Sequence, residues 1–258
     1  MLSYQHAYHA GNMADVHKHA ILAWMLAYLT RKDKPLTYME THAGRALYDL
    51  TDSAAVKTGE AAQGIKIARK WFSADHPYQQ ALAAVETDHG PDAYPGSPLI
   101  AAHLLRPTDP LFLTERHPQE FAALKSVMTR HRAICQERDG WDMALSQCPP
   151  EPRRGMLLID PSYEVKTDYQ TIPKVIGQIH RKWAVGVLAL WYPILTDNPH
   201  KPMVAKLQAA HPEAVVHEVD FPPARPGHRM VGSGMFVINP PYGLEAETAS
   251  LSNHFATL

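Results

Sequence analysis

The sequence has few cysteines, no long apolar run and no excess of charge of either sign. Its two cysteines, Cys135 and Cys148, are too few and too close for a disulfide framework, which indicates a reducing compartment. The longest apolar run, residues 20–29, covers ten residues, whereas a membrane-spanning helix needs ~20. The N-terminus lacks a basic segment followed by an apolar one, so we expect no secretory signal and a soluble cytoplasmic protein.

A formal net charge of -1 provides no overall positive field to attract nucleic acid. Any contact with nucleic acid must therefore come from local basic clusters, namely Arg153-Arg154, Arg181-Lys182, and Arg225 with His228-Arg229. On composition alone such clusters are more typical of solvated loops. The length of 258 residues, 45% of them hydrophobic, allows one large core and a small additional subdomain.

The spacing of apolar residues predicts helices alternating with strands. We expect helices near residues 14–32, 99–105, 120–129, 141–146, 172–183 and 202–210, and strands near 36–40, 111–115, 133–138, 156–159, 185–191, 214–220 and 235–238. This alternation predicts an α/β fold with a mostly parallel sheet and helices on both faces. Residues 47–93 show helical character without a convincing strand, so we expect an inserted small helical subdomain there. Residues 1–46 and 94–258 would form the main domain.

Four acidic residues close four successive predicted strands: Glu40, Glu115, Asp139 and Asp160. Ligands in parallel sheets bind at the carboxyl ends of the strands, so these acids are expected to surround one site. Glu115 could accept hydrogen bonds from the ribose hydroxyls of an adenosine cofactor, although a solvated strand-end charge is equally consistent. Asp139 with Gly140 could bind the adenine, although Asp-Gly alone is more often a turn. The loop at residues 41–44 has one glycine and is a weak dinucleotide signal.

Residues 160–163, Asp-Pro-Ser-Tyr, follow the apolar segment at 155–159 and are typical of enzymes that methylate the exocyclic amine of a nucleobase. That amine is a poor nucleophile, because its lone pair is delocalised into the ring. Asp160 could accept a hydrogen bond from it, and Pro161 could aim a backbone carbonyl as a second acceptor. Tyr163 could stack on the base, which must leave its helix to be reached. An Asp160 carboxylate far from any pocket, or locked in a buried ion pair, would contradict this interpretation.

A second match to the same pattern, Asn239-Pro-Pro-Tyr242, is closer in sequence letters to the amine motif. Only residues 243–258 follow it, which leaves no room for further strands of the sheet. If residues 235–238 form a last, antiparallel strand, this motif lies at the opposite edge of the sheet from the acids. We therefore favour Asp160.

The N-terminal segment contains Tyr4, His6, His9, Asp15, His17 and His19, a set crowded enough to suggest a metal site. On a helix, however, positions i and i+2 point apart, so His17 and His19 cannot easily share one metal ion. We favour histidines that lie near or touch a nucleotide, and we expect no metal.

Several segments together resemble the RlmJ family of bacterial 23S ribosomal RNA adenine-N6 methyltransferases, which use S-adenosyl-L-methionine. They are Ser3-Tyr-Gln-His6, residues 10–19 (AGNMADVHKH), 41–44 (THAG), 94–98 (YPGSP), 114–118 (TERHP) and 158–164 (LIDPSYE). The resemblance covers nearly the whole chain. It implies a class I, Rossmann-like methyltransferase fold with a small helical insertion, and adenine 2030 of 23S ribosomal RNA as the target.

The resemblance also implies roles for individual residues. Asp160 would be the catalytic acceptor and would lie beside the cofactor, and Tyr4 would touch the RNA, as would Pro161 and Tyr163 around the base. Cofactor contacts would come from Lys18, His19, His42, Ser97, Glu115, Asp139 and Gly140. Two departures matter: Ser162 stands where many amine methyltransferases have a second proline, and the short segment after Tyr242 puts RNA contacts from a longer tail in doubt.

The sequence leaves three alternatives open. The Asp160 motif does not distinguish RNA from DNA, so a DNA adenine-N6 methyltransferase is the first. The second is a metal-dependent phosphoesterase that uses the N-terminal histidines, and the third is a non-catalytic nucleic-acid binder. We expect a monomeric enzyme that acts on 23S ribosomal RNA and has no membrane contact.

Overall fold

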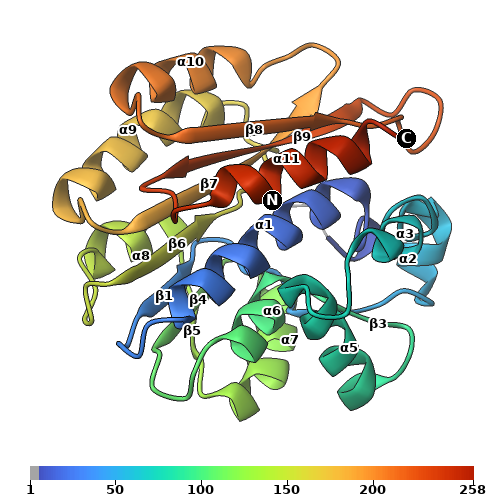
Figure 1. Ribbon diagram of the computed structural model, residues 1–258, viewed down its shortest axis with the longest axis horizontal. Coiled ribbons are helices and arrows are strands. Elements are labelled where there is room, and N and C mark those ends of the chain that lie inside the picture. The colour runs from blue at the N-terminus through green and yellow to red at the C-terminus, as the bar shows by residue number, and fades with distance from the viewer. Residues whose placement is uncertain (1–5) are drawn as a thin grey trace.

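The computed structural model describes residues 6–258 (Figure 1). Its main sheet has seven strands in the order β5-β4-β1-β6-β7-β9-β8, and β9 alone runs antiparallel to its neighbours. The strands are β1 (Thr37–Glu40), β4 (Leu111–Glu115), β5 (Ile134–Glu137), β6 (Gly155–Ile159), β7 (Val187–Leu195), β8 (Val215–Asp220) and β9 (Met230–Ile238). This is the Rossmann-like class I methyltransferase fold, as predicted.

Helices cover both faces of the sheet, and two apolar cores separate them from it. On one face lie α1 (Met13–Thr30), α5 (Pro77–His89), α6 (Ser97–Leu104), α7 (Pro118–Met128) and α11 (Leu244–Phe255). On the other lie α8 (Gly140–Gln147), α9 (Asp168–Lys182) and α10 (Lys201–Ala210). The alternation of side chains along β7 serves both cores: Ala189 belongs to the first, and Leu188 and Leu190 to the second.

Helix α1 begins at a cap that the sequence encodes. The side chain of Asn12 accepts a hydrogen bond from the backbone N–H of Asp15, which satisfies one of the free donors of the first turn. The acidic Asp15 then lies where the helix dipole favours negative charge. The helix is buried along nearly its full length, so it packs its polar residues Asp15, Lys18 and His19 inside the protein.

The segment between β1 and β4 contains strands that the sequence did not predict. β2 (Leu47–Asp49) and β3 (Ala93–Pro95) pair antiparallel as a separate two-stranded sheet. Between them lie the short helices α2 (Ser53–Thr58), α3 (Glu60–Gln63), α4 (Ile65–Ala68) and η2 (Arg69–Trp71), followed by α5. Each strand has three residues, too few for an alternating apolar pattern to be recognised. The boundaries of an inserted subdomain at residues 47–93 remain a prediction.

The C-terminal segment forms α11, which the sequence analysis did not predict. It packs beside α1 and over β8. No helix among residues 6–258 is long and apolar enough to cross a membrane.

Candidate active site

A cavity of about 660 Å³ opens at the carboxyl ends of the parallel strands. It gathers residues from far apart in the sequence, and ten of the eleven predicted site residues line it: Lys18, His19, His42, Ser97, Glu115, Asp139, Gly140, Asp160, Pro161 and Tyr163. Tyr4, predicted to touch RNA, lies outside the residues that the structure describes. The fold thus brings the predicted residues together, while their individual roles are proposals.

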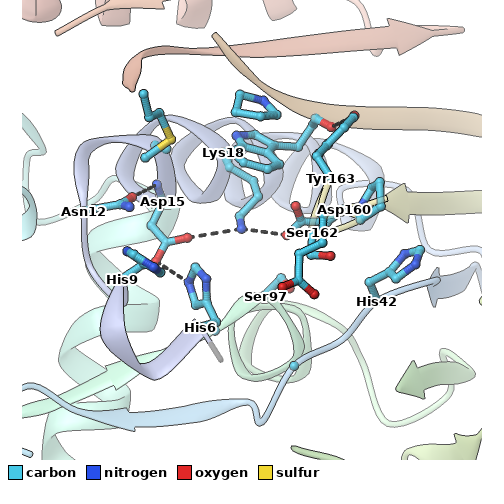
Figure 2. A pocket seen from close by; sticks show the side chains of 18 of the residues that line it. His6, His9, Asn12, Asp15, Lys18, His42, Ser97, Asp160, Ser162 and Tyr163 are labelled. Atoms are coloured by element: carbon cyan, nitrogen blue, oxygen red, sulfur yellow. Dashed lines mark hydrogen bonds and ion pairs between the residues drawn. The ribbon is translucent and has the colours of Figure 1, made fainter. Parts of the chain in front are cut away.

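Lys18 lies at the centre of a chain of charges on the cavity wall (Figure 2). Its Nζ is 2.7 Å from Oδ2 of Asp160 and 3.1 Å from Oδ1 of Asp15. The other oxygen of Asp15 accepts hydrogen bonds from the backbone N–H of Gly11 and from Nε2 of His6, at 2.9 and 2.8 Å. Lys18 was predicted as a cofactor contact, whereas its pairing with Asp160 was not predicted.

Burial acts against the charged forms of these groups, and their mutual attraction outweighs it. For Asp15, burial alone would raise the pKa, but His6 and Lys18 hold that pKa well below its ordinary value. For Lys18, burial alone would lower the pKa, but Asp160 and Asp15 raise it above its ordinary value. Lys18 is therefore a permanent cation, and it compensates two carboxylates that would otherwise repel each other.

Asp160 is paired but not sealed from the cavity. Its side chain is 15% exposed and lines the cavity, against 6% exposure for Lys18. Within residues 6–258, Oδ1 of Asp160 receives no hydrogen bond, since the bond from Lys18 goes to Oδ2. A locked, buried ion pair would have contradicted a catalytic role for Asp160. The observed pair is partly exposed and leaves one carboxylate oxygen available as an acceptor.

Tyr163 closes the motif in an unusual backbone conformation, with a φ of 56°. Its hydroxyl donates a hydrogen bond of 2.7 Å to the backbone oxygen of Trp191. Its ring lies 4.8 Å from that of Tyr169 and 6.0 Å from that of Trp191, measured between centroids. The ring thus lines the cavity but is largely covered by these neighbours, with 9% of the residue exposed.

Glu115 and Asp139 hold the loops on the other side of the cavity. Glu115 accepts hydrogen bonds from the backbone N–H of Gly44 and of His117, at 2.9 and 2.7 Å. Burial raises the pKa of Glu115. Asp139 caps α8 by accepting from the backbone N–H of Trp141 at 2.9 Å. Both carboxylates face the cavity, so they can also accept hydrogen bonds from a ligand.

Gly140 is required by the close approach of two chain segments. A Cβ at this position would lie 2.0 Å from the backbone oxygen of Thr41, the residue that follows β1. This contact fixes the start of α8 against the loop at residues 41–44. The positions of Asp139 and His42 around the cavity therefore depend on a glycine here.

Glu40 does not join the ring of acids around the cavity, which corrects the prediction from its strand-end position. It is fully buried beneath the cavity, where it accepts hydrogen bonds from the hydroxyls of Tyr38 and Ser97, at 2.7 and 2.8 Å. Burial raises its pKa to about 8. Glu40 therefore supports Ser97, which does line the cavity.

The N-terminal histidines point in different directions, as the helical spacing predicted. His19 lies beside Asp15 and bonds to the hydroxyl of Tyr94 at 2.9 Å, whereas His17 bonds to Ser233 and His217 on the strands. Burial lowers the pKa of His19 to about 3 and that of His42 to about 4, so both are neutral near pH 7. Over residues 6–258 no three His, Cys, Asp or Glu side chains are arranged to hold a metal ion.

The second motif lies away from the cavity, as the strand direction predicted. Asn239 follows the antiparallel β9 and donates hydrogen bonds to the backbone oxygens of Ala184 and Gly186, both at 2.8 Å. These two residues precede β7, so they mark the amino ends of the parallel strands. Tyr242 is 87% exposed, and none of residues 239–242 lines the cavity.

Other residues of the cavity were not predicted as site residues. Trp191 on β7 lies beside Lys18, with Nζ 5.3 Å from the centre of the indole ring. Residues 225–229, in the loop from β8 to β9, form part of the rim and include the basic cluster of Arg225, His228 and Arg229. The sequence shows that cluster but not its location, which depends on the pairing of the last two strands.

Comparison with known proteins agrees with this geometry. The family model described as ribosomal RNA large subunit methyltransferase D, RlmJ, matches residues 33–258. Two proteins named ribosomal RNA large subunit methyltransferase J are similar: one from Escherichia coli is 41% identical, and one from Haemophilus influenzae is 37% identical. Each alignment covers 96% of this chain and 90% of the relative.

Among solved structures, a protein from Legionella pneumophila superposes with a TM-score of 0.86 at 33% identity. That superposition covers 96% of this chain and 93% of the other chain. The resemblance identified from the sequence motifs is thereby confirmed. The chain belongs to the RlmJ family of large-subunit ribosomal RNA methyltransferases.

Proposed function

We propose that this chain transfers a methyl group from S-adenosyl-L-methionine to the N6 amine of an adenine in 23S ribosomal RNA, with adenine 2030 as the expected position. One observation carries the chemistry: the carboxylate of Asp160 faces the cavity with Oδ1 available, next to Pro161. Family membership and the names of the relatives support ribosomal RNA as the substrate.

The cavity residues fit S-adenosyl-L-methionine. Carboxylates at the ends of β4 and β5 can accept the hydroxyls of a ribose and the amine of an adenine, and here Glu115 and Asp139 occupy those positions. Lys18 offers a cation for a carboxylate group, and the neutral His42 and Ser97 offer uncharged polar contacts. When bound, the cofactor supplies a methyl group on a positively charged sulfur.

The protein contributes acceptors and positioning. Oδ1 of Asp160 accepts one N–H of the target amine, and the backbone oxygen of Pro161 accepts the other. This draws the nitrogen lone pair away from the ring and stabilises the positive charge that develops on nitrogen as it gains the methyl group. Lys18 holds Oδ2 and so fixes the plane of the carboxylate. As the N–C bond forms, the electron pair of the broken S–C bond would stay on the sulfur of the cofactor, and the nitrogen would release its surplus proton to water at the open side of the cavity.

The experiment is transfer of tritiated methyl groups from S-adenosyl-L-methionine to RNA from cells that lack this protein. We expect label in 23S RNA, at one adenine, as mapped by nuclease digestion and chromatography of the nucleosides. Duplex DNA of matched adenine content runs in parallel. Label in DNA rather than RNA would replace the RNA substrate by a DNA one, and label in neither would contradict the proposed activity.

We further expect the enzyme to act as a monomer in the cytoplasm. Light scattering on the purified chain measures the mass directly, and a value near the 28.8 kDa of one chain is the expected result. A mass twice as large, unchanged on dilution, would contradict the monomer.

A further inference from the structure

Trp191 lies at the same level of the sheet as Asp160. In the register of β6 and β7, Ile159 pairs with Leu190, so Asp160 and Trp191 are the next residues along neighbouring parallel strands. The indole of Trp191 lies against Lys18, the partner of Asp160, and lines the same cavity. Trp191 is only partly buried, whereas the neighbouring Tyr163 is buried. Trp191 is thus the more exposed of these two aromatic residues that line the cavity.

A chain of four hydrogen bonds holds the indole from behind. Nε1 of Trp191 donates to Oγ of Ser233 at 2.9 Å, and Oγ of Ser233 lies 2.8 Å from Nδ1 of His17. Nε2 of His17 lies 2.8 Å from Nδ1 of His217, whose Nε2 lies 2.8 Å from Oγ of Ser252. The chain runs through β7, β9, α1, β8 and α11, in the layer between the sheet and the helices of one face.

The donors and acceptors available in these groups fix the direction in which this series of hydrogen bonds runs, from Trp191 towards Ser252. An indole N–H can only donate, so Ser233 accepts from Trp191 and has its own proton to donate. Burial lowers the pKa of His17 well below its ordinary value, so this imidazole is neutral, with one donor and one acceptor. If Ser233 donates to Nδ1, His17 donates from Nε2 to His217, and every group is satisfied. In the reverse direction, the fully buried hydroxyl of Ser233 would have no acceptor among residues 6–258.

We propose that the indole of Trp191 forms the side wall of the slot that receives the extruded adenine, and that Ser233 and His17 are positioning residues that fix its orientation. This inference rests on the proposed function and adds a base-contacting residue to it. A satisfied, buried polar chain is rigid, and a rigid aromatic wall favours the extruded state of the base over the stacked state in the RNA.

Replacement of the indole should lower kcat more than it changes KM for RNA. Contacts to phosphates hold the RNA whether or not the base is extruded, so loss of the wall reduces the fraction of bound RNA with its base in the slot. For Trp191→Leu we expect a fall in kcat of about tenfold or more, the size of one lost base–aromatic contact. KM for RNA and the affinity for S-adenosyl-L-methionine should change less than about threefold. Unchanged kcat in this variant would overturn the inference.

A double-mutant cycle tests whether Ser233 acts through the indole. Ser233→Ala removes the acceptor, and Trp191→Phe keeps a ring but removes the donor. Each alone should lower kcat about three- to tenfold, the size of one hydrogen bond, and the double variant should be no slower than Trp191→Phe. If the fold-losses in kcat of the two single variants multiply in the double variant, Ser233 does not act through the indole of Trp191. Should Ser233→Ala fail to fold, Ser233→Cys provides a side chain of similar size with a weak acceptor, and the same result is expected.

The matched control is Trp183→Phe. Trp183 is fully buried, and its Nε1 donates to the backbone oxygen of Arg153, but it lies in the core on the other face of the sheet from the hydrogen bonds behind Trp191. This variant should lower the melting temperature and leave kcat unchanged. If it lowers kcat as much as Trp191→Phe does, the effects report general destabilisation, and the positioning role is wrong. Failure of the proposed function is distinct, because the unsubstituted chain would then transfer no methyl group.

Discussion

Lys18 and Asp160 are 142 positions apart in the sequence, and their charged atoms lie 2.7 Å apart at the edge of the sheet. The same ammonium group contacts Asp15 within its own helix, at 3.1 Å. The acceptor proposed for the target amine is therefore anchored to α1. Helix α1 is in turn buried against the sheet, which gives the carboxylate little freedom to turn.

Asp160→Ala should abolish methyl transfer, with a loss of about 1,000-fold or more, because it removes an acceptor aimed at developing charge. The fold should survive, since Lys18 keeps Asp15 as a partner. The measurements are tritium transfer to 23S RNA and a thermal unfolding curve of the same sample. Wild-type transfer by this variant would remove Asp160 from the mechanism.

The second motif provides a matched control for the first. Asn239→Ala should leave transfer to 23S RNA within about twofold of wild type, because this residue lies at the opposite edge of the sheet. It should lower the free energy of unfolding by about 1–3 kcal/mol, because two backbone oxygens lose their donor. Transfer assays check the predicted activity, and urea unfolding checks the predicted loss of stability. A variant that stays folded but loses activity would place the wrong motif at the site.

Glu40 should make the protein less stable as the pH rises. Burial raises its folded pKa from 4.5 to about 8, so between these values the folded state binds a proton that the unfolded state has released. The stability from this group is complete below about pH 4.5 and is lost as the pH rises to about 8, by at most about 1.4 kcal/mol per pH unit. Glu40→Gln, which mimics the protonated form, should lack this component. Urea unfolding of wild type and Glu40→Gln between about pH 4.5 and 8 measures this difference. If the free energies of unfolding of the two proteins changed with pH in the same way, the raised pKa of Glu40 would be contradicted.

Gly140→Ala should weaken cofactor binding. The added Cβ would overlap the backbone oxygen of Thr41, so α8 and the loop at residues 41–44 must separate and carry Asp139 and His42 apart. We expect a loss of about 1–3 kcal/mol in the free energy of unfolding and weaker binding of S-adenosyl-L-methionine in titration calorimetry.

Gly177→Ala is the control for this substitution. Its Cβ would meet only a side-chain atom of Arg181, at 3.6 Å, at a half-buried position of α9. In a helix this change should stabilise the protein by about 1 kcal/mol. Equal effects of the two substitutions on cofactor affinity would show that the contact at Thr41 is unimportant.

Local patterns in the sequence were sufficient to predict the main sheet and its helices. β1, β6 and β7 are buried on both sides, and β6 and β7 show this in the sequence as continuous apolar segments. The pattern was insufficient for β2 and β3, which have three residues each, and for α11, whose apolar residues are sparse. The edge strand β5 was predicted although it is largely uncovered, because Ile134 and Cys135 precede a turn signal.

The residues of the site could be predicted from the sequence, but the hydrogen bonds and ion pairs between them could not. Strand-end positions and family motifs located Glu115, Asp139 and Asp160, because parallel strands deliver their ends to one edge. They did not reveal that Glu40 turns inward, since that depends on Tyr38 and Ser97 reaching it. The pairing of Lys18 with Asp160 and the chain behind Trp191 depend on how α1 crosses the sheet. No spacing along the sequence encodes that crossing.

The antiparallel direction of β9 determines which part of the cavity rim can change in length. Because β8 and β9 form an antiparallel pair, their connection emerges beside the parallel strand ends and carries Arg225, His228 and Arg229 there. Such a hairpin connection can lengthen or shorten without rerouting a helix across the sheet. The portion of the entrance that bears these basic side chains can therefore be redesigned to suit a different RNA shape while the catalytic edge stays in place.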